Sequence, residues 1–423
     1  VYKRQTLPCG SVLRNRIAKS AMTEGLADPF DNPTKAHNTL YRTWDDGGLG
    51  LQITGNVMID RRFLERFGNV VVEDEQAIDA LKAWAAAGHA TDGQIWMQIS
   101  HPGRQCQKLV NTRPMAPSAV QLRLMGLFGN PRAMSENDIA DVIARYTNTA
   151  RIAQKAGFDG VQIHGAHGYL ISQFLSSATN QRRDKWGGSV ANRARFLREI
   201  IASVRNEVGH DFPVSVKLNS ADFQKGGFSQ DECKMVAGWL SDDGIDLLEI
   251  SGGTYEQLSM FNGPNAEVQR ESTRRREAYF IEYARNIRDA VNIPLMVTGG
   301  FRTRASMESA VEKDGIDVIG LARPVCTAPD IANDLLNGSV RELDSFEEQL
   351  VLGTGYLGLN TSILPIKAIN AFGSLGFFYW QIIRLSQGLQ PDKRIRLVGH
   401  FLRHMRNEFR LNRLRKKALK AAL

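Results

Sequence analysis

Cysteine is scarce in this chain, and long apolar runs are missing from it. Four cysteines are scattered through 423 residues, at Cys9, Cys106, Cys233 and Cys326. This spacing fits neither a disulfide framework nor a clustered Fe–S or zinc site. No apolar run reaches the roughly 18 residues that a bilayer-spanning helix needs. We therefore expect a protein of a reducing, cytosolic setting.

Two further features are lacking near the N-terminus. The opening residues VYKRQ provide neither an initiator Met nor the apolar core of a signal peptide, so we expect the sequence to begin inside a longer chain. The first β-type run leads into AKSAMT (residues 18–23), which is not the Gly-rich fingerprint of a dinucleotide-binding sheet. An open doubly wound sheet is disfavoured by this, but it stays open as an alternative.

Short β-type runs alternate with helical stretches through the first 340 residues. We predict strands at 16–22, 49–57, 93–100, 161–164, 214–219, 247–251, 295–298 and 317–321. Helices are predicted at 73–90, 136–156, 190–208, 230–241, 276–290, 304–313 and 330–336, the second opened by a capping box of Ser135 and Asp138. Alternation implies a parallel sheet, and eight units close it. The predicted fold class is α/β: a (β/α)8 TIM barrel at residues 1–344, followed by a mainly helical extension at 345–423.

Residues able to carry chemistry follow the predicted strands, where TIM barrels place their active sites. In chain order these are Thr23, Asn56, Gln98, His101, the group His164, His167 and Tyr169, then Lys217, Gly299–Gly300 and Ala322–Arg323. The last two pairs follow the seventh and eighth strands, where barrels commonly hold a phosphate. Glycine lets backbone N–H groups approach an oxyanion, and arginine adds a bidentate charge. Long loops at 101–134 and 252–275 are predicted lids or binding loops.

The stretch from 160 to 201 concentrates these signals. His164, His167 and Tyr169 lie within six residues, directly after the fourth predicted strand. A lone histidine is most often a satisfied core or surface residue, but a pair followed by a tyrosine predicts a site of proton chemistry. A histidine pair could also ligate a metal in a barrel hydrolase, yet no convergent carboxylates or further histidines stand at the other strand ends.

The chain resembles the Old Yellow Enzyme family of FMN-dependent NAD(P)H:flavin oxidoreductases, or ene-reductases, from about residue 6 to residue 336. The signature is HGAHGYLISQFLSSATNQRRDKWGGSVANRARFLREII, and six more segments follow the family order: NRIAKSAMTE, GLGLQITGNV, WMQISHPGRQ, VSVKLNSADF, EISGGTYE and VTGGFRT. The resemblance implies FMN across the C-terminal mouth of the barrel. Its expected binding residues are Ala21, Met22, Thr23, Asn56, Gln98, Lys217, Gly299, Gly300, Ala322 and Arg323.

The same resemblance implies a division of labour. Thr23 would lie near flavin C4 oxygen and N5, Gln98 at the pyrimidine edge, and Lys217 near N1 and O2. His164 and His167 would donate to the substrate's oxygen, and Tyr169 would protonate the α-carbon. NAD(P)H would reduce FMN and leave before an activated alkene binds. Three positions depart from the common family pattern: Ala21 for Pro, Asn56 for Gly or Ala, and Ala322 for Gly.

Charge is concentrated in the C-terminal tail. The chain carries +8, but residues 393–423 hold eleven Lys or Arg and one acid, Glu408, which leaves −2 for the rest. Val398, Phe401, Met405 and Phe409 recur at helical spacing and predict an amphipathic helix. We expect its apolar face to pack on the barrel or on a second copy of the chain. The alternative is an anionic membrane surface, and with it a binding protein on a redox-inactive barrel; no nucleic-acid motif accompanies the charge.

Overall fold

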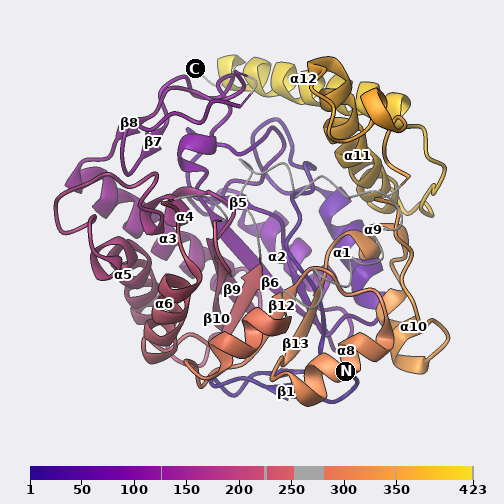
Figure 1. Cartoon of the computed structure of the whole chain (residues 1–423), viewed down its shortest axis with the longest axis horizontal. Helices are drawn as coiled ribbons and strands as arrows, with labels where there is room; N and C mark the ends of the chain where they lie inside the picture. Colours follow the sequence, from indigo (N-terminus) through magenta and orange to yellow (C-terminus); the bar gives the residue numbers. More distant parts are fainter. Residues whose placement is uncertain (125, 223–225, 252–280, 348, 422–423) are drawn as a thin grey trace.

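The computed structural model describes the chain except at residues 125, 223–225, 252–280, 348 and 422–423, and its main body is a closed barrel (Figure 1). Eight parallel strands form this barrel in the described chain: β3 (Ile17–Lys19), β4 (Leu51–Ile53), β6 (Gln94–Ser100), β9 (Gly160–Gly165), β10 (Val214–Asn219), β11 (Leu247–Ser251), β12 (Leu295–Thr298) and β13 (Val318–Leu321). The ring closes through the pairs β4–β6 and β13–β3. The predicted TIM barrel is confirmed.

Helices predicted from the sequence lie between the strands. They are α2 (Ile78–Gly88), α3 (Glu136–Lys155), α5 (Val190–Val208), α6 (Gln230–Asp242), α8 (Arg304–Lys313) and α10 (Ile331–Asn337). The capping box of Ser135 and Asp138 is present at the start of α3. The predicted helix at 276–290 lies partly outside the described residues, and residues 281–288 are helical. The predicted binding loop at 252–275 lies outside them altogether.

Several elements were not predicted. Three are helices: α1 (Lys35–Asp46), α4 (Leu170–Leu175) and α9 (Arg323–Thr327). Short strands add a β1 (Gln5–Thr6) and β2 (Val12–Leu13) pair, a β7 (Met115–Ala116) and β8 (Arg132–Ala133) pair, and β5 (Val57–Met58) beside the end of β6. The β7–β8 pair lies within the predicted long loop at 101–134.

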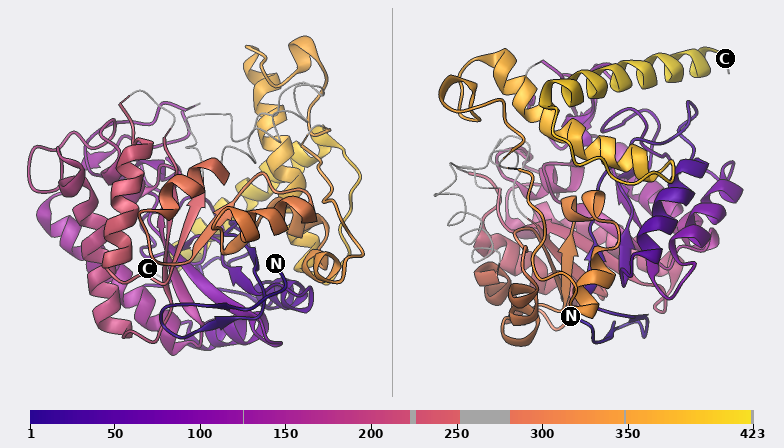
Figure 2. Two further views of the ribbon diagram at one scale, coloured as in Figure 1. Left: turned by 60° about the horizontal axis from the view of Figure 1, so that its bottom comes forward. Right: turned by 90° about the vertical axis from the view of Figure 1, so that its right-hand side faces the viewer.

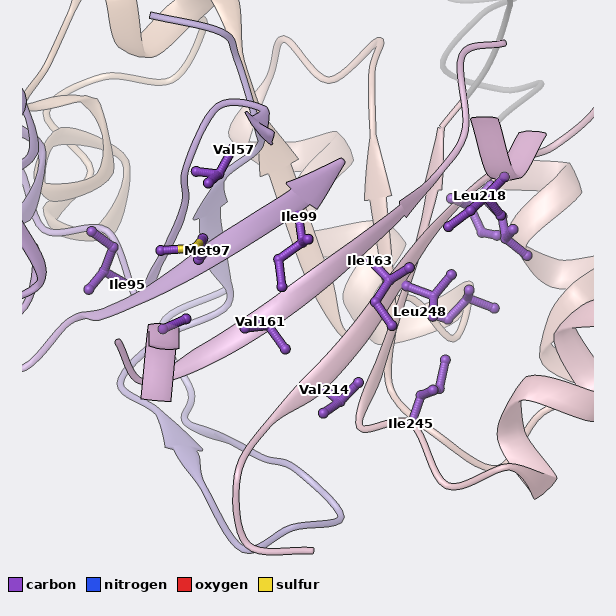
Figure 3. Close-up of a cluster of buried hydrophobic side chains, with 14 of the residues drawn as sticks. Val57, Ile95, Met97, Ile99, Val161, Ile163, Val214, Leu218, Ile245 and Leu248 are labelled. Carbon is purple, nitrogen blue, oxygen red and sulfur yellow. The ribbon is translucent and has the colours of Figure 1, made fainter. Parts of the chain in front are cut away.

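Successive side chains along each strand point alternately into and out of the barrel, which gives it two apolar regions and one polar layer. Outward side chains such as Ile95, Val161 and Val214 pack against the helices (Figure 3). Inward side chains near the strand starts form a second apolar cluster: Leu7, Leu13, Ala18, Leu51, Ile53, Trp96, Leu247, Met296 and Val318. This cluster closes the N-terminal end, so the inward positions further along the strands are left for polar residues.

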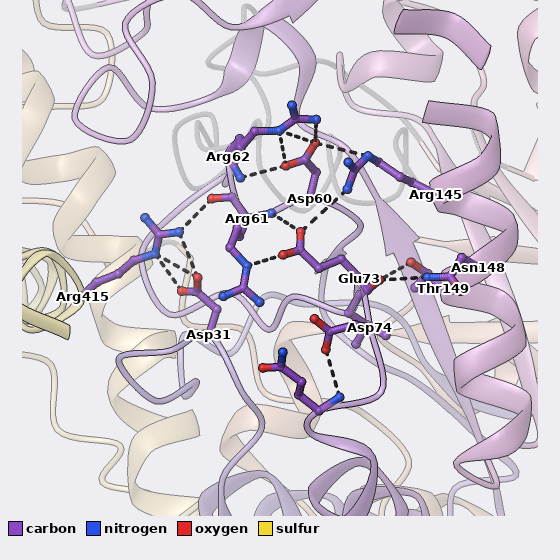
Figure 4. A network of polar contacts seen from close by, with 12 residues as sticks. Asp31, Asp60, Arg61, Arg62, Glu73, Asp74, Arg145, Asn148, Thr149 and Arg415 are labelled. Atoms are coloured by element: carbon purple, nitrogen blue, oxygen red, sulfur yellow. Dashed lines mark hydrogen bonds and ion pairs between the residues drawn. The ribbon is translucent and has the colours of Figure 1, made fainter. Parts of the chain in front are cut away.

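The C-terminal extension is a pair of helices, α11 (Leu364–Leu385) and α12 (Leu397–Ala421), which pack on each other; α11 also contacts α1 and α9. Figure 2 shows α12 lying across one end of the molecule. The C-terminal part of α12 is fixed by Arg415, whose guanidinium binds both carboxylate oxygens of Asp31 and the carbonyl oxygen of Arg61 (Figure 4).

The predicted amphipathic tail helix is confirmed, but the expected packing of its apolar face on the barrel is wrong for Val398 and Phe409, which are 46% and 61% exposed. The buried face instead carries Leu397, His400 and His404. The cause is α11, where a side chain on Gly373 or Gly376 would collide with Leu397 and His400. Close approach through glycine selects this face of α12. Contact with a second copy stays a prediction.

Within the part of the chain that the structure describes, no helix is both long enough and apolar enough to cross a membrane.

Candidate active site

The inward polar layer joins two predicted site residues that lie on different strands. Gln98 Nε2 donates to Gln162 Oε1 at 2.7 Å, and Gln162 Nε2 donates to Glu249 Oε2 at 2.8 Å. Glu249 Oε1 then accepts from Lys217 Nζ at 2.9 Å and from Thr298 Oγ1 at 2.6 Å. Gln98 and Lys217 are therefore brought into one buried network, and Glu249, which the sequence analysis missed, is its centre.

The loops after β3 and β4 are tied together by Glu24. Its Oε1 accepts from the N–H of Gly55 at 2.9 Å and from the hydroxyl of Tyr41 on α1. Gly55 is required here because a Cβ would lie 2.3 Å from Glu24 Oε2. This anchor holds together the loops that carry Thr23 and Asn56.

His164, His167 and Tyr169 form a cluster at the end of β9. His164 Nε2 lies 3.2 Å from His167 Nδ1, and the Tyr169 ring centroid lies 4.7 Å from that of His164. His167 Nε2 lies 3.0 Å from Ser251 Oγ, and the His167 N–H donates to Asn219 Oδ1 at 2.9 Å. The predicted trio is thus assembled, with the two imidazoles in contact with each other.

Burial keeps the histidine pair neutral. It lowers the pKa of His164 well below its usual range, and the neighbouring His167 and Lys217 lower it further. Burial and then Lys217 lower the pKa of His167 in the same direction. Each ring therefore carries one N–H at neutral pH, and the pair can donate hydrogen bonds without adding charge to the site.

The backbone at His167 is held in an uncommon conformation. Its φ is 61°, in the left-handed region, and Gly168 follows with a φ of 77°. A non-glycine residue there costs free energy unless its surroundings impose the conformation. The bond from the His167 N–H to Asn219 supplies that restraint and aims the imidazole back toward β9.

Gly299–Gly300 and Ala322–Arg323 follow the paired strands β12 and β13, as predicted for a phosphate site. The structure adds an acidic residue between the arginines. Glu347 Oε1 lies 3.0 Å from Arg323 Nη1 and 2.9 Å from Arg302 Nη2. Burial by itself raises the pKa of Glu347, but Arg323 and Arg302 outweigh it and lower the pKa to about 2. The carboxylate is therefore ionised and partners the arginine predicted to bind phosphate.

His101, also predicted near the site, has a packing role in the structure. Its Nδ1 accepts from the N–H of Gly103 at 3.0 Å, and its ring lies 4.9 Å from that of Phe63. Among the residues described, no group of three or more His, Cys, Asp or Glu side chains is placed to hold a metal ion.

Comparison with known proteins places this chain in a family. Residues 9–341 match the sequence model described as the NADH:flavin oxidoreductase / NADH oxidase family. The chain is 35% identical over 361 residues to the NADH-dependent flavin oxidoreductase iliE of Hypocrea jecorina (strain QM6a), a match that covers 80% of this chain and 90% of that protein. It is 38% identical over 350 residues to the NADH-dependent flavin oxidoreductase iccE of Talaromyces variabilis, covering 77% and 84%.

A solved structure shows the same fold. The Old Yellow Enzyme homologue from Zymomonas mobilis superposes with a TM-score of 0.68 at 25% identity, covering 82% of this chain and 95% of that chain. The extension that follows α10 lies beyond the residues matched by the family.

Proposed function

Since the chain belongs to the NADH:flavin oxidoreductase / NADH oxidase family, with FMN as its cofactor, we propose that it uses NADH or NADPH to reduce activated C=C bonds such as those of enones and nitroalkenes. The observation that carries this proposal is the cluster of His164, His167 and Tyr169 at the barrel mouth. Two neutral N–H donors beside a phenol suit a substrate that accepts hydrogen bonds on one atom and a proton on another.

The residues at the mouth fit FMN. Asn56 Oδ1 and His164 Nδ1 are buried atoms without a hydrogen-bond partner among the described residues, and so are available to a polar ligand. Side chains or backbone that stay partly exposed ring the same mouth: Ala21, Met22, Thr23, Gly299, Gly300, Ala322 and Arg323. This pattern supports a ligand with a polar ring system and an anionic end.

We assign the holding of FMN to three groups of residues. Thr23 and Asn56 would hold the ring on one side of the mouth, and Gln98 and Lys217 would hold it from the barrel centre. Gly299, Gly300 and Arg323 bind the phosphate through backbone N–H groups and the guanidinium. Bound there, FMN would supply the redox chemistry that amino-acid side chains lack, namely hydride transfer between nicotinamide and substrate.

The remaining roles belong to the protein. His164 and His167 donate to the carbonyl or nitro oxygen of the substrate and stabilise the negative charge that develops on it. A substrate oxygen would replace the contact that the two rings make with each other. Tyr169 gives its phenolic proton to the α-carbon, which completes the saturation of the double bond. The proton is later restored from solvent.

The direct test is reconstitution of the full chain with FMN. We expect a stoichiometric yellow complex whose visible absorbance is bleached by NADH or NADPH without oxygen and returns when an enone is added. A chain that takes up no FMN contradicts the proposal.

A second property, attachment to an anionic membrane surface, is favoured by one observation. The face of α12 that carries Val398, Leu402 and Phe409 is exposed, at 46%, 60% and 61%, and Arg403, Arg406, Arg410 and Arg413 are exposed beside it. Apolar and basic side chains together on one exposed helix face are typical of helices that lie in a lipid headgroup region. We propose this contact as an addition to the oxidoreductase.

A further inference from the structure

Glu65 connects the candidate flavin site to the C-terminal extension. It lies in the segment between β5 and α2, at the barrel mouth and partly exposed. Thr23 Oγ1 donates to Glu65 Oε2 at 3.0 Å, and Asn69 Nδ2 donates to the same oxygen at 3.2 Å. Asn69 also donates to the carbonyl oxygen of Asn56 at 3.2 Å. The Glu65 carboxylate thus contacts Thr23 and also forms a hydrogen bond with the side chain of Asn56, the second residue assigned to the flavin edge.

The next residue anchors this segment on the extension. Arg66 is buried, its guanidinium forms an ion pair with Glu408 of α12, and its Cζ lies 3.8 Å from the ring centroid of Tyr379 on α11. The N–H of Arg66 donates to Asn69 Oδ1 at 2.8 Å, which closes the turn. The helical pair α11–α12 therefore fixes the position of Glu65 relative to Thr23.

The direction of the Thr23 hydrogen bond matters because a hydroxyl has one proton. When Glu65 is ionised it can only accept, so the Thr23 proton is committed to it. The Thr23 oxygen then offers only lone pairs to a group on its other side. When Glu65 is protonated, or replaced by a residue that can donate, the Thr23 proton is released to bind a different acceptor.

We propose that Glu65 is a positioning residue that makes Thr23 a hydrogen-bond acceptor toward the bound flavin and thereby lowers the reduction potential of the cofactor. This rests on the proposed function, which places Thr23 at the flavin edge. Reduction adds electron density to the ring, so a lost donor and a nearby negative charge both disfavour it. Protonation of Glu65 reverses both effects and raises the potential.

The groups around Glu65 leave its pKa above that of an ordinary glutamate. Burial raises the pKa of Glu65, and the charge of Arg66 and the side-chain hydrogen bonds of Asn69, Thr23 and Asn56 oppose this only in part. The charge of Arg66 is itself balanced by Glu408. His404 of α12 adds no charge, because burial and then Arg66 lower its pKa to about 3. Glu65 therefore exchanges its proton at a pH above that of an ordinary glutamate.

The test compares the FMN-loaded wild type with Glu65→Gln and with a control, Glu207→Gln, which removes an exposed carboxylate of α5 far from the mouth in sequence. The midpoint potential is measured by equilibration with redox dyes over the whole pH range in which the protein stays folded. We expect Glu65→Gln to favour reduced FMN at least tenfold at pH 8, about 30 mV for a two-electron couple. It should also lose a break in the pH profile that the wild type and the control share.

A double variant separates positioning from a through-space charge effect. In a Thr23→Val background the hydroxyl is gone, so Glu65→Gln should shift the potential much less than in the wild type. An equal shift in both backgrounds overturns the positioning role. A protein that binds FMN and oxidises NADH, but whose potential is the same with Glu65 or Gln, overturns this inference and leaves the proposed function intact.

Glu408→Gln provides the test if Glu65→Gln fails to fold or to bind FMN. Without the partner carboxylate, Arg66 lowers the pKa of Glu65 further, so the break in the potential profile should move to lower pH. An unmoved break counts against the inference. Absence of FMN binding by the wild type counts against the proposed function instead.

Discussion

Lys217 and Glu249 face each other at registered positions of β10 and β11, with Nζ 2.9 Å from Oε1, and their side chains are 3% and 0% exposed. The resemblance implied a cation at Lys217, near flavin N1 and O2. In the structure its charge is balanced by a carboxylate that also accepts from Gln162 and Thr298. These side chains therefore form one buried hydrogen-bonded network at the barrel centre, in which each member depends on the others.

The first prediction follows from this burial. Glu249→Gln should lower the free energy of unfolding by about 3 kcal/mol, because it leaves Lys217 charged and buried without a counter-ion. Glu308→Gln, which breaks the more exposed pair with Arg304 on α8, should cost less than about 0.5 kcal/mol. Urea denaturation measures both. Equal losses would show that the Lys217–Glu249 pair is not desolvated as described.

The second prediction concerns the phosphate end of the site. Glu347 forms ion pairs with Arg323 and Arg302, and its charge competes with the phosphate of FMN for them. Glu347→Gln should therefore tighten FMN binding several-fold. The exposed Glu342→Gln in the same segment is the matched control and should leave the dissociation constant unchanged. Quenching of FMN fluorescence gives both constants. Weaker binding by Glu347→Gln would mean that Glu347 holds the arginines in place for the phosphate.

The third prediction is a loss of stability in acid caused by buried histidines. Burial lowers the pKa of His37 and of His101 to about 4, whereas both titrate near pH 6.5 when unfolded. The unfolded state therefore takes up more protons, and stability that is complete above pH 6.5 falls as the pH drops toward 4. Each histidine should lower the free energy of unfolding by roughly 1.4 kcal/mol for each pH unit of acidification in this window.

A His37→Gln variant isolates one part of that dependence. Its ring packs on Trp84 and its Nδ1 accepts from the Thr34 N–H, so the variant should be less stable at pH 7. Its stability should nevertheless fall more gently between pH 6 and pH 4.5, by roughly 2 kcal/mol less than in the wild type. Parallel profiles would show that His37 accepts a proton in the folded state.

The fourth prediction tests the exposed face of α12. The full chain should sediment with vesicles rich in phosphatidylserine and not with neutral phosphatidylcholine vesicles, and added salt should release it. Replacing Leu402 and Phe409 together by Ser should weaken this binding at least tenfold. Tyr356→Ser removes another highly exposed apolar residue, outside α12, and should have no effect. Equal sedimentation with both kinds of vesicle, or none with either, rules out the proposed surface.

The sequence predicted the barrel because each strand leaves a local pattern of apolar residues bounded by small or polar ones. Helix α1 was missed although His37, Leu40, Tyr41 and Trp44 recur at helical spacing, since its other residues are mostly polar. Because the barrel was predicted, the positions of the candidate site residues at the ends of its strands could be predicted too.

The acidic partners in the site could not be predicted in the same way. Glu65 meets Thr23 across 42 positions, and Glu347 meets Arg302 across 45. Such contacts depend on how loops pack at the mouth and leave no local pattern. The prediction of which face of α12 is buried was wrong for a related reason. Glycines on α11, and not the apolar spacing of α12, decide which face is covered.

The central claim is that Tyr169 delivers a proton to an alkene polarised by His164 and His167. Wild type and Tyr169→Phe are loaded with FMN, reduced with one equivalent of NADH without oxygen, and mixed with cyclohexenone in a stopped-flow spectrometer. Bleaching by NADH should proceed alike in both, while the return of flavin absorbance should be at least about 100-fold slower in the variant. Equal rates of return in the two proteins, or no return in the wild type, would contradict the account.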